Sequence, residues 1–503
     1  MNDGTGHVSA PAAARPIDAV PWAPGGEGFL GHNREFREER LPMLDRFAAS
    51  REPIFRLRLP IPGFHALVVN APETVQELLV EKGKSFDKSD MLRFTLHHLG
   101  GEGLFTANGE LWRRQRRLMA PLFQPKALER YADAMVTASR RVADRWQDGE
   151  RMPLLRETTT LTMSVAGKTL FDADTFGEAD EIGRALTTAL EWTAWVAGRP
   201  LSVSHLIARR SLRKLTPRAP SWARASLVAA ADRLQRPLVL VGERGRALEG
   251  AVATLDSRVQ RMIDERRASL ARGEVKEDLL SLLLEARHED HGSRMSDKQV
   301  RDEILTLFVA GHETTATGLA WSIYLLAKNP EVYAAVQREV DALPGEPSVA
   351  DLSRLDLCAR VFKEALRLYP PVYVVGRDSN ERVTLGGYDL PPLVQVMYSA
   401  WALHRSPHVW PDPLRFDPDR FLPENEAKRH RYAWVPFGAG PRVCIGNHFA
   451  IMEAQLALAV MLRRASFELE GEEEPEPSAT LRPKHGVRVR VRLREAHARS
   501  RAS

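Results

Sequence analysis

One cysteine of the chain stands in a setting that favours a thiolate ligand. Cys444 ends the glycine-rich string FGAGPRVC and opens a predicted helix that runs from about residue 444 to 464. Because the N-terminus of a helix stabilises negative charge, this position favours a deprotonated sulfur. Glycines at 438, 440 and 446 allow backbone conformations and close approaches that a side chain would obstruct. A large flat cofactor lying against this loop would need both properties.

Two other interpretations of Cys444 compete with a cofactor ligand. Most lone cysteines at the start of a helix are small buried residues with no further role. Zinc is the second alternative, because His448 lies one helical turn further along the chain. A zinc ion needs about four ligands, however, and the sequence has no second Cys–His pair at a suitable spacing. The ordered string of Phe, Gly, Arg, Cys and Gly residues therefore favours a cofactor.

The string FGAGPRVCIG resembles the haem-binding signature of the cytochrome P-450 family. The residues in the family's positions are Phe437, Gly440, Arg442, Cys444 and Gly446. The resemblance extends over roughly residues 41–493. It implies that haem b (iron protoporphyrin IX) is the cofactor, that Cys444 is its axial ligand, and that the other loop residues contact the haem.

A second motif interrupts a long apolar helix predicted over residues 304–326, where the polar cluster GHETTAT begins at Gly311. A threonine hydroxyl there can bond the carbonyl of the preceding turn and bend or open the helix. AGHETT resembles the family's distal-helix motif, which implies that Glu313 and Thr314 deliver protons to dioxygen and that Ala310 and Gly311 lie against the haem. A solvent-facing glutamate near a helix start is the plainer alternative. The metalloprotease pattern HExxH is excluded, because residue 316 is alanine.

A third group of charged residues has no catalytic chemistry of its own. Glu364 and Arg367 are spaced i, i+3 on one helix face, which alone is most often a surface ion pair worth under ~1 kcal/mol. The string FDPDRF adds Arg420 between apolar anchors. The resemblance implies that these three side chains form a buried ion cluster, which holds the proximal side of the haem site in shape.

Haem carries two carboxylates, so its pocket needs cationic or N–H donors. Trp112 and Arg116 are four residues apart and share one helix face. With Arg377 and Arg442 they match the family's propionate contacts, although a solvated arginine is the default for each cation alone.

The resemblance also implies an apolar substrate pocket and a separate electron donor. The pocket residues it indicates are Leu104, Phe105, Phe308, Val309, Val372, Val374 and Val375, each of which is a core residue by default. An apolar pocket favours a lipophilic substrate such as a fatty acid, terpenoid, steroid or polyketide. Because the chain ends soon after the haem domain, we expect a separate ferredoxin or flavodoxin with its NAD(P)H reductase. The dense basic cluster Arg113, Arg114, Arg116 and Arg117 would attract such an acidic partner.

The elements that must position these residues are mostly helices. Nearly every segment from about residue 111 to 368 has helical spacing, whereas Pro, Gly and β-branched residues dominate from 370 to 446. Two apolar runs at 53–59 and 65–70 predict a hairpin, followed by a helix that Pro72 opens. The sequence therefore predicts a mainly α fold with small β-sheets (α+β), a single large domain of the cytochrome P-450 fold. We expect a flexible Pro/Gly/Ala-rich arm over 1–40, the haem domain over 41–496 and a tail over 497–503.

Composition narrows the function classes. The 503 residues carry a net charge of +5 and no run of five like charges, which argues against a nucleic-acid partner. Two cysteines exclude a disulfide framework and favour a reducing compartment. The sequence lacks both a signal peptide and a stretch of ~20 apolar residues, so we expect a cytoplasmic protein without a membrane anchor.

The resemblance implies a haem-dependent monooxygenase that inserts one oxygen atom from O2 into its substrate. Two alternatives stay open: a haem-thiolate peroxygenase or isomerase, which needs no reductase, and a haem sensor or carrier without turnover. Peroxygenase and isomerase branches typically lack the acid–alcohol pair. Glu313 and Thr314 therefore favour the monooxygenase.

Overall fold

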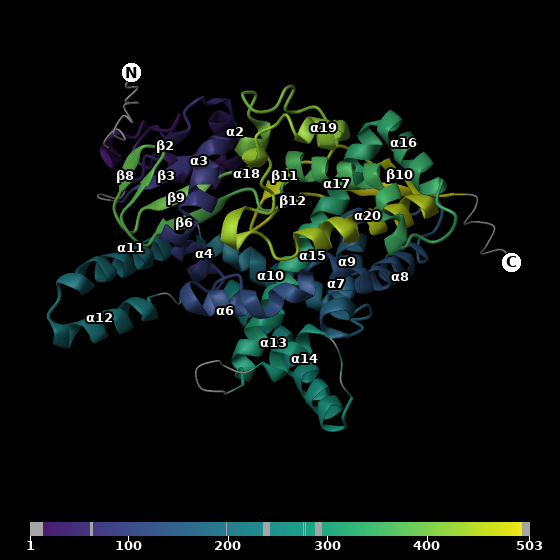
Figure 1. Ribbon diagram of the computed structural model, residues 1–503, viewed down its shortest axis with the longest axis horizontal. Helices are drawn as coiled ribbons and strands as arrows, with labels where there is room; N and C mark the ends of the chain where they lie inside the picture. Colours follow the sequence, from purple (N-terminus) through teal and green to yellow (C-terminus); the bar gives the residue numbers. More distant parts are fainter. Residues whose placement is uncertain are drawn as a thin grey trace, which may run out of the picture.

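Helices dominate the computed structural model, which describes residues 14–60, 64–197, 199–234, 242–274, 276, 278–286 and 294–494. The α-helices are α1 (His32–Glu38), α2 (Arg40–Ala49), α3 (Pro72–Gln76), α4 (Asp90–Thr95), α5 (His97–Gly100), α6 (Gly109–Met119), α7 (Pro125–Leu128), α8 (Ala132–Ala143), α9 (Leu154–Phe171), α10 (Ala179–Ala197), α11 (Pro200–Leu215), α12 (Ser221–Arg233), α13 (Glu243–Ala271), α14 (Leu279–Glu285), α15 (Asp297–Lys328), α16 (Pro330–Asp341), α17 (Asp356–Leu368), α18 (Ala400–Arg405), α19 (Pro423–Glu426) and α20 (Asn447–Arg464). Figure 1 shows most of the strands gathered on one side of the molecule and the long helices on the other. The predicted mainly α fold with small sheets is confirmed.

The strands form small mixed sheets. They are β1 (Arg15–Pro16), β2 (Ile54–Arg56), β3 (Ala66–Val69), β4 (Phe86–Lys88), β5 (Arg151–Pro153), β6 (Val375–Ser379), β7 (Val383–Leu385), β8 (Tyr388–Leu390), β9 (Gln395–Tyr398), β10 (Ala465–Leu469), β11 (Pro475–Pro477), β12 (Leu481–Pro483) and β13 (Arg488–Leu493). The largest sheet has the order β2-β3-β9-β6-β4, and β2 and β3 are the predicted hairpin. In this sheet β4 runs antiparallel to β6, which places Lys88 directly opposite Arg377.

Helix α15 crosses the centre of the molecule and packs against α9, α17 and α20. It begins at a capping box, in which the Ser296 hydroxyl accepts the Gln299 N–H and the Gln299 side chain accepts the Ser296 N–H. Its apolar residues are buried along most of its length because neighbouring helices cover it on several sides. Although α15 has 32 residues, no described helix combines the length and apolarity needed to cross a membrane.

Helix α15 is uninterrupted, which corrects the expected opening at the polar cluster. The Thr314 hydroxyl does donate a hydrogen bond to the Ala310 carbonyl, at 2.7 Å. The helix accommodates this bond without losing a turn, since residues 297–328 are all helical.

Two other boundaries differ from the sequence expectations. The arm expected over 1–40 is ordered from residue 15 on: β1 pairs with β8, and Ile17, Val20 and Ala23 are buried. Residues 1–13 and the tail over 497–503 lie outside the described residues. Helix α20 begins at Asn447, so Cys444 lies in a turn three positions before it rather than at its first residue.

Candidate functional site

The loop that carries Cys444 is a tight turn closed by its own backbone. The Cys444 N–H donates to the Phe437 carbonyl at 2.8 Å, and the Val443 N–H donates to the Gly440 carbonyl at 3.1 Å. Gly440 has a φ of +67°, and a Cβ there would lie 1.9 Å from the backbone oxygen of Leu79. The loop therefore requires glycine at 440, both for its left-handed conformation and for its approach to residues 77–81.

The sulfur of Cys444 lies in a recess. Its side chain is accessible, yet burial by the surrounding protein raises the pKa of the thiol. The Gly446 N–H and the Arg116 guanidinium both act in the opposite direction and lower this pKa. An accessible thiol enclosed by protein fits a metal ligand, because coordination removes the proton outright.

Two small residues, Ala310 and Gly311, leave part of the surface of α15 uncovered. Ala310 is exposed and Gly311 is half-buried, whereas residues 304–308 before them are buried. The nearest neighbour of a Cβ built at Gly311 would be the Ala166 methyl at 4.0 Å. Bare helix surface of this kind fits the flat face of a haem.

The acid and the alcohol expected to carry protons follow this opening directly. The Glu313 Oε1 accepts a hydrogen bond from the Thr480 hydroxyl at 2.7 Å, while its buried Oε2 has no hydrogen-bond partner among the described residues. His312 between these positions is buried and contacts the Phe308 carbonyl at 2.6 Å. Glu313 and Thr314 are thus half-buried at the opening, whereas the His312 ring is in the core.

A group of cations lies beside Trp112. The Arg442 guanidinium lies 4.5 Å from the Trp112 ring centroid and the Lys88 ammonium 5.9 Å from it. Burial, Arg442 and Arg377 lower the pKa of Lys88 to about 6. Glu303 is the carboxyl group that acts on Lys88, and Asp87 pairs with Arg442 at 3.0 Å. Arg377 lies opposite Lys88 and pairs with no carboxylate among the described residues, which leaves room for an anion beside it.

These residues fit haem. Its two carboxylates match the surplus of cations around Trp112, and the iron would face the accessible sulfur of Cys444. Arg116 lies close enough to Cys444 to influence its pKa, which places this arginine on the sulfur side of the group. Lys88 was not expected from the sequence, because no motif marks it and only the pairing of β4 with β6 brings it opposite Arg377.

The expected ion cluster is assembled and fully buried at its centre. Glu364 and Arg367 form two hydrogen bonds of 2.6 and 2.8 Å, and Arg420 lies 3.6 Å from the Glu364 carboxylate. Arg367 also donates to three backbone carbonyls, those of His404, Pro413 and Arg415. Burial raises the pKa of Glu364, while the two arginines lower it. The cluster ties α17 to residues 404–417, before the cysteine loop.

The expected pocket residues differ in how far the structure exposes their side chains. Leu104 is buried, Phe105 is 40% exposed, and Val309, Val372, Val374 and Val375 are half-buried. Phe308 is only 3% exposed, and its ring centroid lies 4.9 Å from that of Phe171. Phe308 therefore packs between α15 and α9. Its place in a substrate pocket, like that of the other expected pocket residues, stays a prediction, because helical periodicity does not distinguish core residues from pocket residues.

Comparison with known proteins identifies the family of the chain. The family model described as cytochrome P450 matches residues 24–490. The chain belongs to the cytochrome P450 family. It is similar to cyclooctatin synthase from Streptomyces melanosporofaciens (34% identical, covering 88% of each chain) and to pentalenene oxygenase from Streptomyces avermitilis (32% identical, covering 88% of this chain and 89% of the relative). Among solved structures, the haem domain of cytochrome P450DA superposes with a TM-score of 0.77 at 28% identity, covering 96% of this chain and 99% of that one.

Membership fixes the class of the enzyme. The protein is a cytochrome P450 monooxygenase with haem as its cofactor. Such enzymes use dioxygen, a lipophilic substrate and electrons from a redox partner. A further relative, cyclooctat-9-en-7-ol 5-monooxygenase from Streptomyces melanosporofaciens, is 32% identical and covers 90% of this chain and 92% of the relative.

Proposed function

We propose that this P450 oxygenates a cyclic terpenoid. The three relatives from Streptomyces support this choice among lipophilic substrates, since their names refer to cyclooctatin, cyclooctat-9-en-7-ol and pentalenene. The reaction consumes one O2, two electrons and two protons, converts a C–H bond to C–OH and releases one water. The terpenoid class rests on these names, whereas the observation that supports oxygenation at this site is the opening at Ala310 and Gly311, a bare helix surface that an acid and an alcohol follow.

Each site residue then has a defined task. Cys444 would hold the haem through its sulfur, and the bound haem would supply the oxygen-activating chemistry. Arg377 and Arg442 would pair with the haem carboxylates. Glu313 would relay protons through its Oε2, which no other described group binds, and the Ala310 carbonyl positions the hydroxyl of Thr314.

Replacing Cys444 tests the ligand assignment. Cys444→Ser should abolish the red-shifted absorption band that the reduced protein gives with carbon monoxide, because a serine oxygen does not replace thiolate donation. The matched control is Cys358→Ser, which removes the buried cysteine of α17 and should leave the band in place. An unchanged band in Cys444→Ser would disprove the assignment.

The substrate class can be tested by optical titration of the haem protein. A cyclic sesquiterpene hydrocarbon, a cyclic diterpene alcohol, palmitic acid and progesterone would each be added, and the shift of the main haem absorption band recorded. We expect the two terpenoids to bind most tightly. With ¹⁸O2 and a reducing system, the product should gain one labelled oxygen. Tighter binding and turnover of palmitic acid or progesterone would overturn the terpenoid assignment.

We also propose that a separate ferredoxin or flavodoxin supplies the electrons. Helix α6 carries four arginines, of which Arg113 and Arg117 are exposed while Arg114 and Arg116 are half-buried. The Arg113 side chain is 58% exposed and pairs only with Glu110 of its own helix among the described residues. This basic surface lies on the same helix as Arg116, which influences the pKa of Cys444, so an acidic partner bound there would be near the haem ligand.

A further inference from the structure

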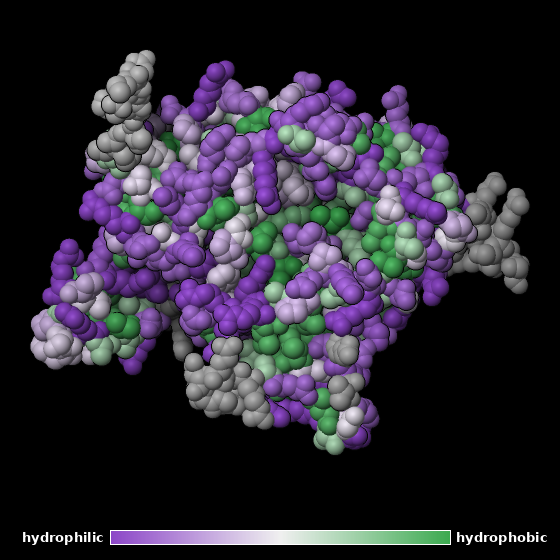
Figure 2. Space-filling view, viewed as in Figure 1, coloured by the Kyte–Doolittle hydropathy of each residue, from purple (hydrophilic) through white to green (hydrophobic). Residues whose placement is uncertain are grey.

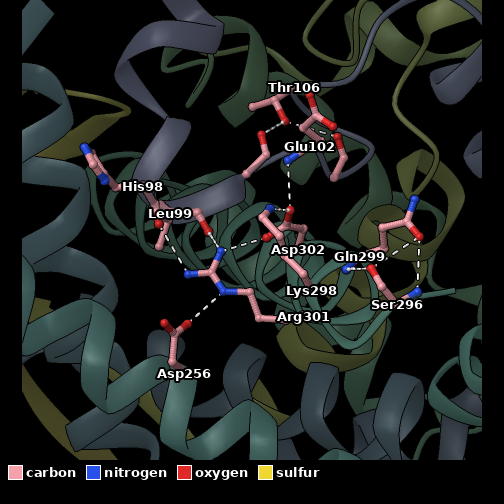
Figure 3. Close-up of polar contacts among 12 residues, drawn as sticks. His98, Leu99, Glu102, Thr106, Asp256, Ser296, Lys298, Gln299, Arg301 and Asp302 are labelled. Atoms are coloured by element: carbon pink, nitrogen blue, oxygen red, sulfur yellow. Dashed lines mark hydrogen bonds and ion pairs between the residues drawn. The ribbon is translucent and has the colours of Figure 1, made fainter. Parts of the chain in front are cut away.

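Residues 98–107 comprise most of α5 and the turn that leads towards α6. The backbone of this segment is bound to α15 (Figure 3). The Arg301 guanidinium donates to the carbonyls of Leu99 at 3.0 Å and His98 at 3.3 Å. The same group donates to Asp256 of α13 at 2.7 Å and to Asp302 at 2.9 Å. A single side chain thus connects the segment to two long helices.

The next two residues of α15 continue this attachment. Asp302 accepts the Glu102 N–H at 3.0 Å, and Glu303 accepts the Leu104 N–H at 2.8 Å. From the other side, the Lys88 ammonium of β4 donates to the Leu104 carbonyl at 2.5 Å. Both backbone groups of Leu104 are therefore bound by buried ionisable side chains, and the low polarity of the protein interior strengthens such hydrogen bonds.

Close packing leaves the segment little space to shift towards α15. Gly101 has a φ of +47°, and a Cβ there would lie 2.2 Å from the Asp302 carboxylate. A Cβ at Gly103 would lie 2.2 Å from the Thr306 hydroxyl and 2.5 Å from the Asp302 carbonyl oxygen. The Thr106 hydroxyl closes the turn internally by donating to the Gly101 carbonyl at 2.7 Å (Figure 3). A side chain at residue 101 or 103 would push the segment away from α15, so this contact requires glycine at both positions.

We propose that Arg301, Asp302 and Glu303, the clamp residues, are positioning residues that determine substrate specificity by fixing where Leu104 and Phe105 lie. This inference rests on the proposed function, together with the family resemblance that places Leu104 and Phe105 in the substrate pocket. The clamp binds the backbone of residues 98, 99, 102 and 104, so it sets the direction of the side chains at 104 and 105. Phe105 is 40% exposed, so its ring is accessible to a ligand.

Two pairs of variants test the clamp in the haem-loaded protein. Arg301→Gln removes the bonds to the segment, and its control Lys298→Gln removes a 74% exposed side chain that contacts only Asp302 among the described residues. Glu303→Leu removes the acceptor for the Leu104 N–H, whereas Glu303→Gln keeps an amide oxygen in its place. All four should retain the haem absorption spectrum, which shows that the variants fold.

The first readout is amide hydrogen exchange at Glu102 and Leu104. Arg301→Gln and Glu303→Leu should raise exchange there by about 10-fold, the effect of losing one such hydrogen bond, while both controls stay within about 2-fold. The second readout uses imidazole and 4-phenylimidazole as haem ligands of different size. Arg301→Gln and Glu303→Leu should weaken the binding of 4-phenylimidazole by about 10-fold and the binding of imidazole by less than about 2-fold. The reason is that only the larger ligand reaches the apolar side chains of Leu104 and Phe105.

Either of two results would overturn the inference. Unchanged exchange would show that the clamp does not hold the segment, and faster exchange with unchanged azole selectivity would show that the segment does not shape the site. Neither readout uses a terpenoid, so failure of the terpenoid assignment is distinguished from failure of the clamp.

Discussion

At the scale of single residues, two buried ionisable side chains, those of Lys88 and Glu303, bind the backbone of Leu104 from opposite sides. Burial, followed by the nearby cations Arg442 and Arg377, lowers the pKa of Lys88 to about 6. Burial raises the pKa of Glu303 to about 8, against the Leu104 N–H and Lys88, which lower it. Desolvation therefore moves both groups towards their neutral forms.

The raised pKa of Glu303 predicts a pH-dependent stability. Between the ordinary value of 4.5 and about 8, the folded protein keeps this proton while the unfolded chain loses it, so rising pH removes stability. Glu303→Gln lacks this titration. We expect the variant to gain stability relative to the wild type by up to about 4 kcal/mol between about pH 5 and 8.

Urea unfolding of the haem protein at several pH values measures this difference. Lys88 contributes with the opposite sign in both proteins, and Glu303 acts on its pKa, so the comparison reports the titration of Glu303 together with this coupling. A difference that stays constant with pH would contradict the assignment.

The hydroxyl of Thr314 makes a second prediction at this scale. Thr314→Ala removes the group that is held by the Ala310 carbonyl, so product formation should fall by about 10²-fold while reductant is still consumed and peroxide is released. Thr314→Ser, which keeps a hydroxyl, should retain most of the product yield. Tight coupling of reductant to product in the alanine variant would mean that protons arrive by another route.

How far the sequence predicts the site depends on whether a residue belongs to a local motif. Cys444, Glu313 and Thr314 follow from strings of adjacent residues, and the structure places each of them beside accessible surface. Lys88 does not, because its role arises from a cross-strand neighbour that lies almost three hundred residues away in the chain. The contact between Phe308 and Phe171 could not be predicted for a related reason, since Phe171 belongs to a helix that is distant in the sequence.

At the scale of elements, the conformation of the cysteine loop depends on residues 77–81, against which the loop packs. Residues 77–81 form a π-helical turn, and the Leu79 carbonyl approaches Gly440 so closely that no Cβ fits between them. The position of the haem ligand is therefore coupled to an element that lies outside the loop's own sequence.

Gly440→Ala should destabilise the protein and loosen haem binding. The left-handed backbone alone costs about 1 kcal/mol for alanine, and the contact with Leu79 raises the total to about 2 kcal/mol or more. The control is Gly387→Ala, which has a φ of +78° but no neighbour within 4 Å. Urea midpoints and the ratio of haem to protein absorbance measure the two effects. Equal losses in both variants would show that the close approach is unimportant.

Element boundaries follow from the sequence only where the signal is local. The hairpin of β2 and β3 is confirmed, because turn residues and apolar runs lie side by side in the chain. The sequence did not predict the ordered structure of residues 15–40, because β1 pairs with β8, which lies more than three hundred and fifty residues away. The start of α20 was placed too early because the glycine-rich turn continues past Cys444.

At the scale of the whole molecule, polar and apolar side chains are distributed unevenly over the surface. The face in Figure 2 is mostly polar, and apolar side chains gather near its middle, around α13 and α15 in the matching view of Figure 1. The net charge of +5 is small for 503 residues, so local groups such as the arginines of α6 determine how a charged partner is attracted.

Charge reversal at Arg113 and Arg117 tests this attraction. The double variant Arg113→Glu/Arg117→Glu should slow reduction by an acidic ferredoxin by about 10-fold at low ionic strength. The difference should shrink at about 0.5 M salt, where screening shortens the range of charge interactions.

The control Lys214→Glu/Arg218→Glu changes the net charge equally, at exposed positions of α11 and the turn that follows it. It should leave the rate within about 2-fold of wild type. An unchanged rate and salt dependence in the α6 variant would exclude this docking surface.

The clamp on the 98–107 segment has a consequence for how such an enzyme diversifies. Arg301, Asp302 and Glu303 bind carbonyl and N–H groups, which every amino acid except proline offers in the same place. The exposed side chains at 102 and 105 can therefore be exchanged while the segment keeps its position, provided that the glycines at 101 and 103 remain. Libraries that randomise residue 105, and that vary the buried Leu104 only among apolar residues, should yield altered selectivity without loss of the fold as long as residues 301–303 are kept.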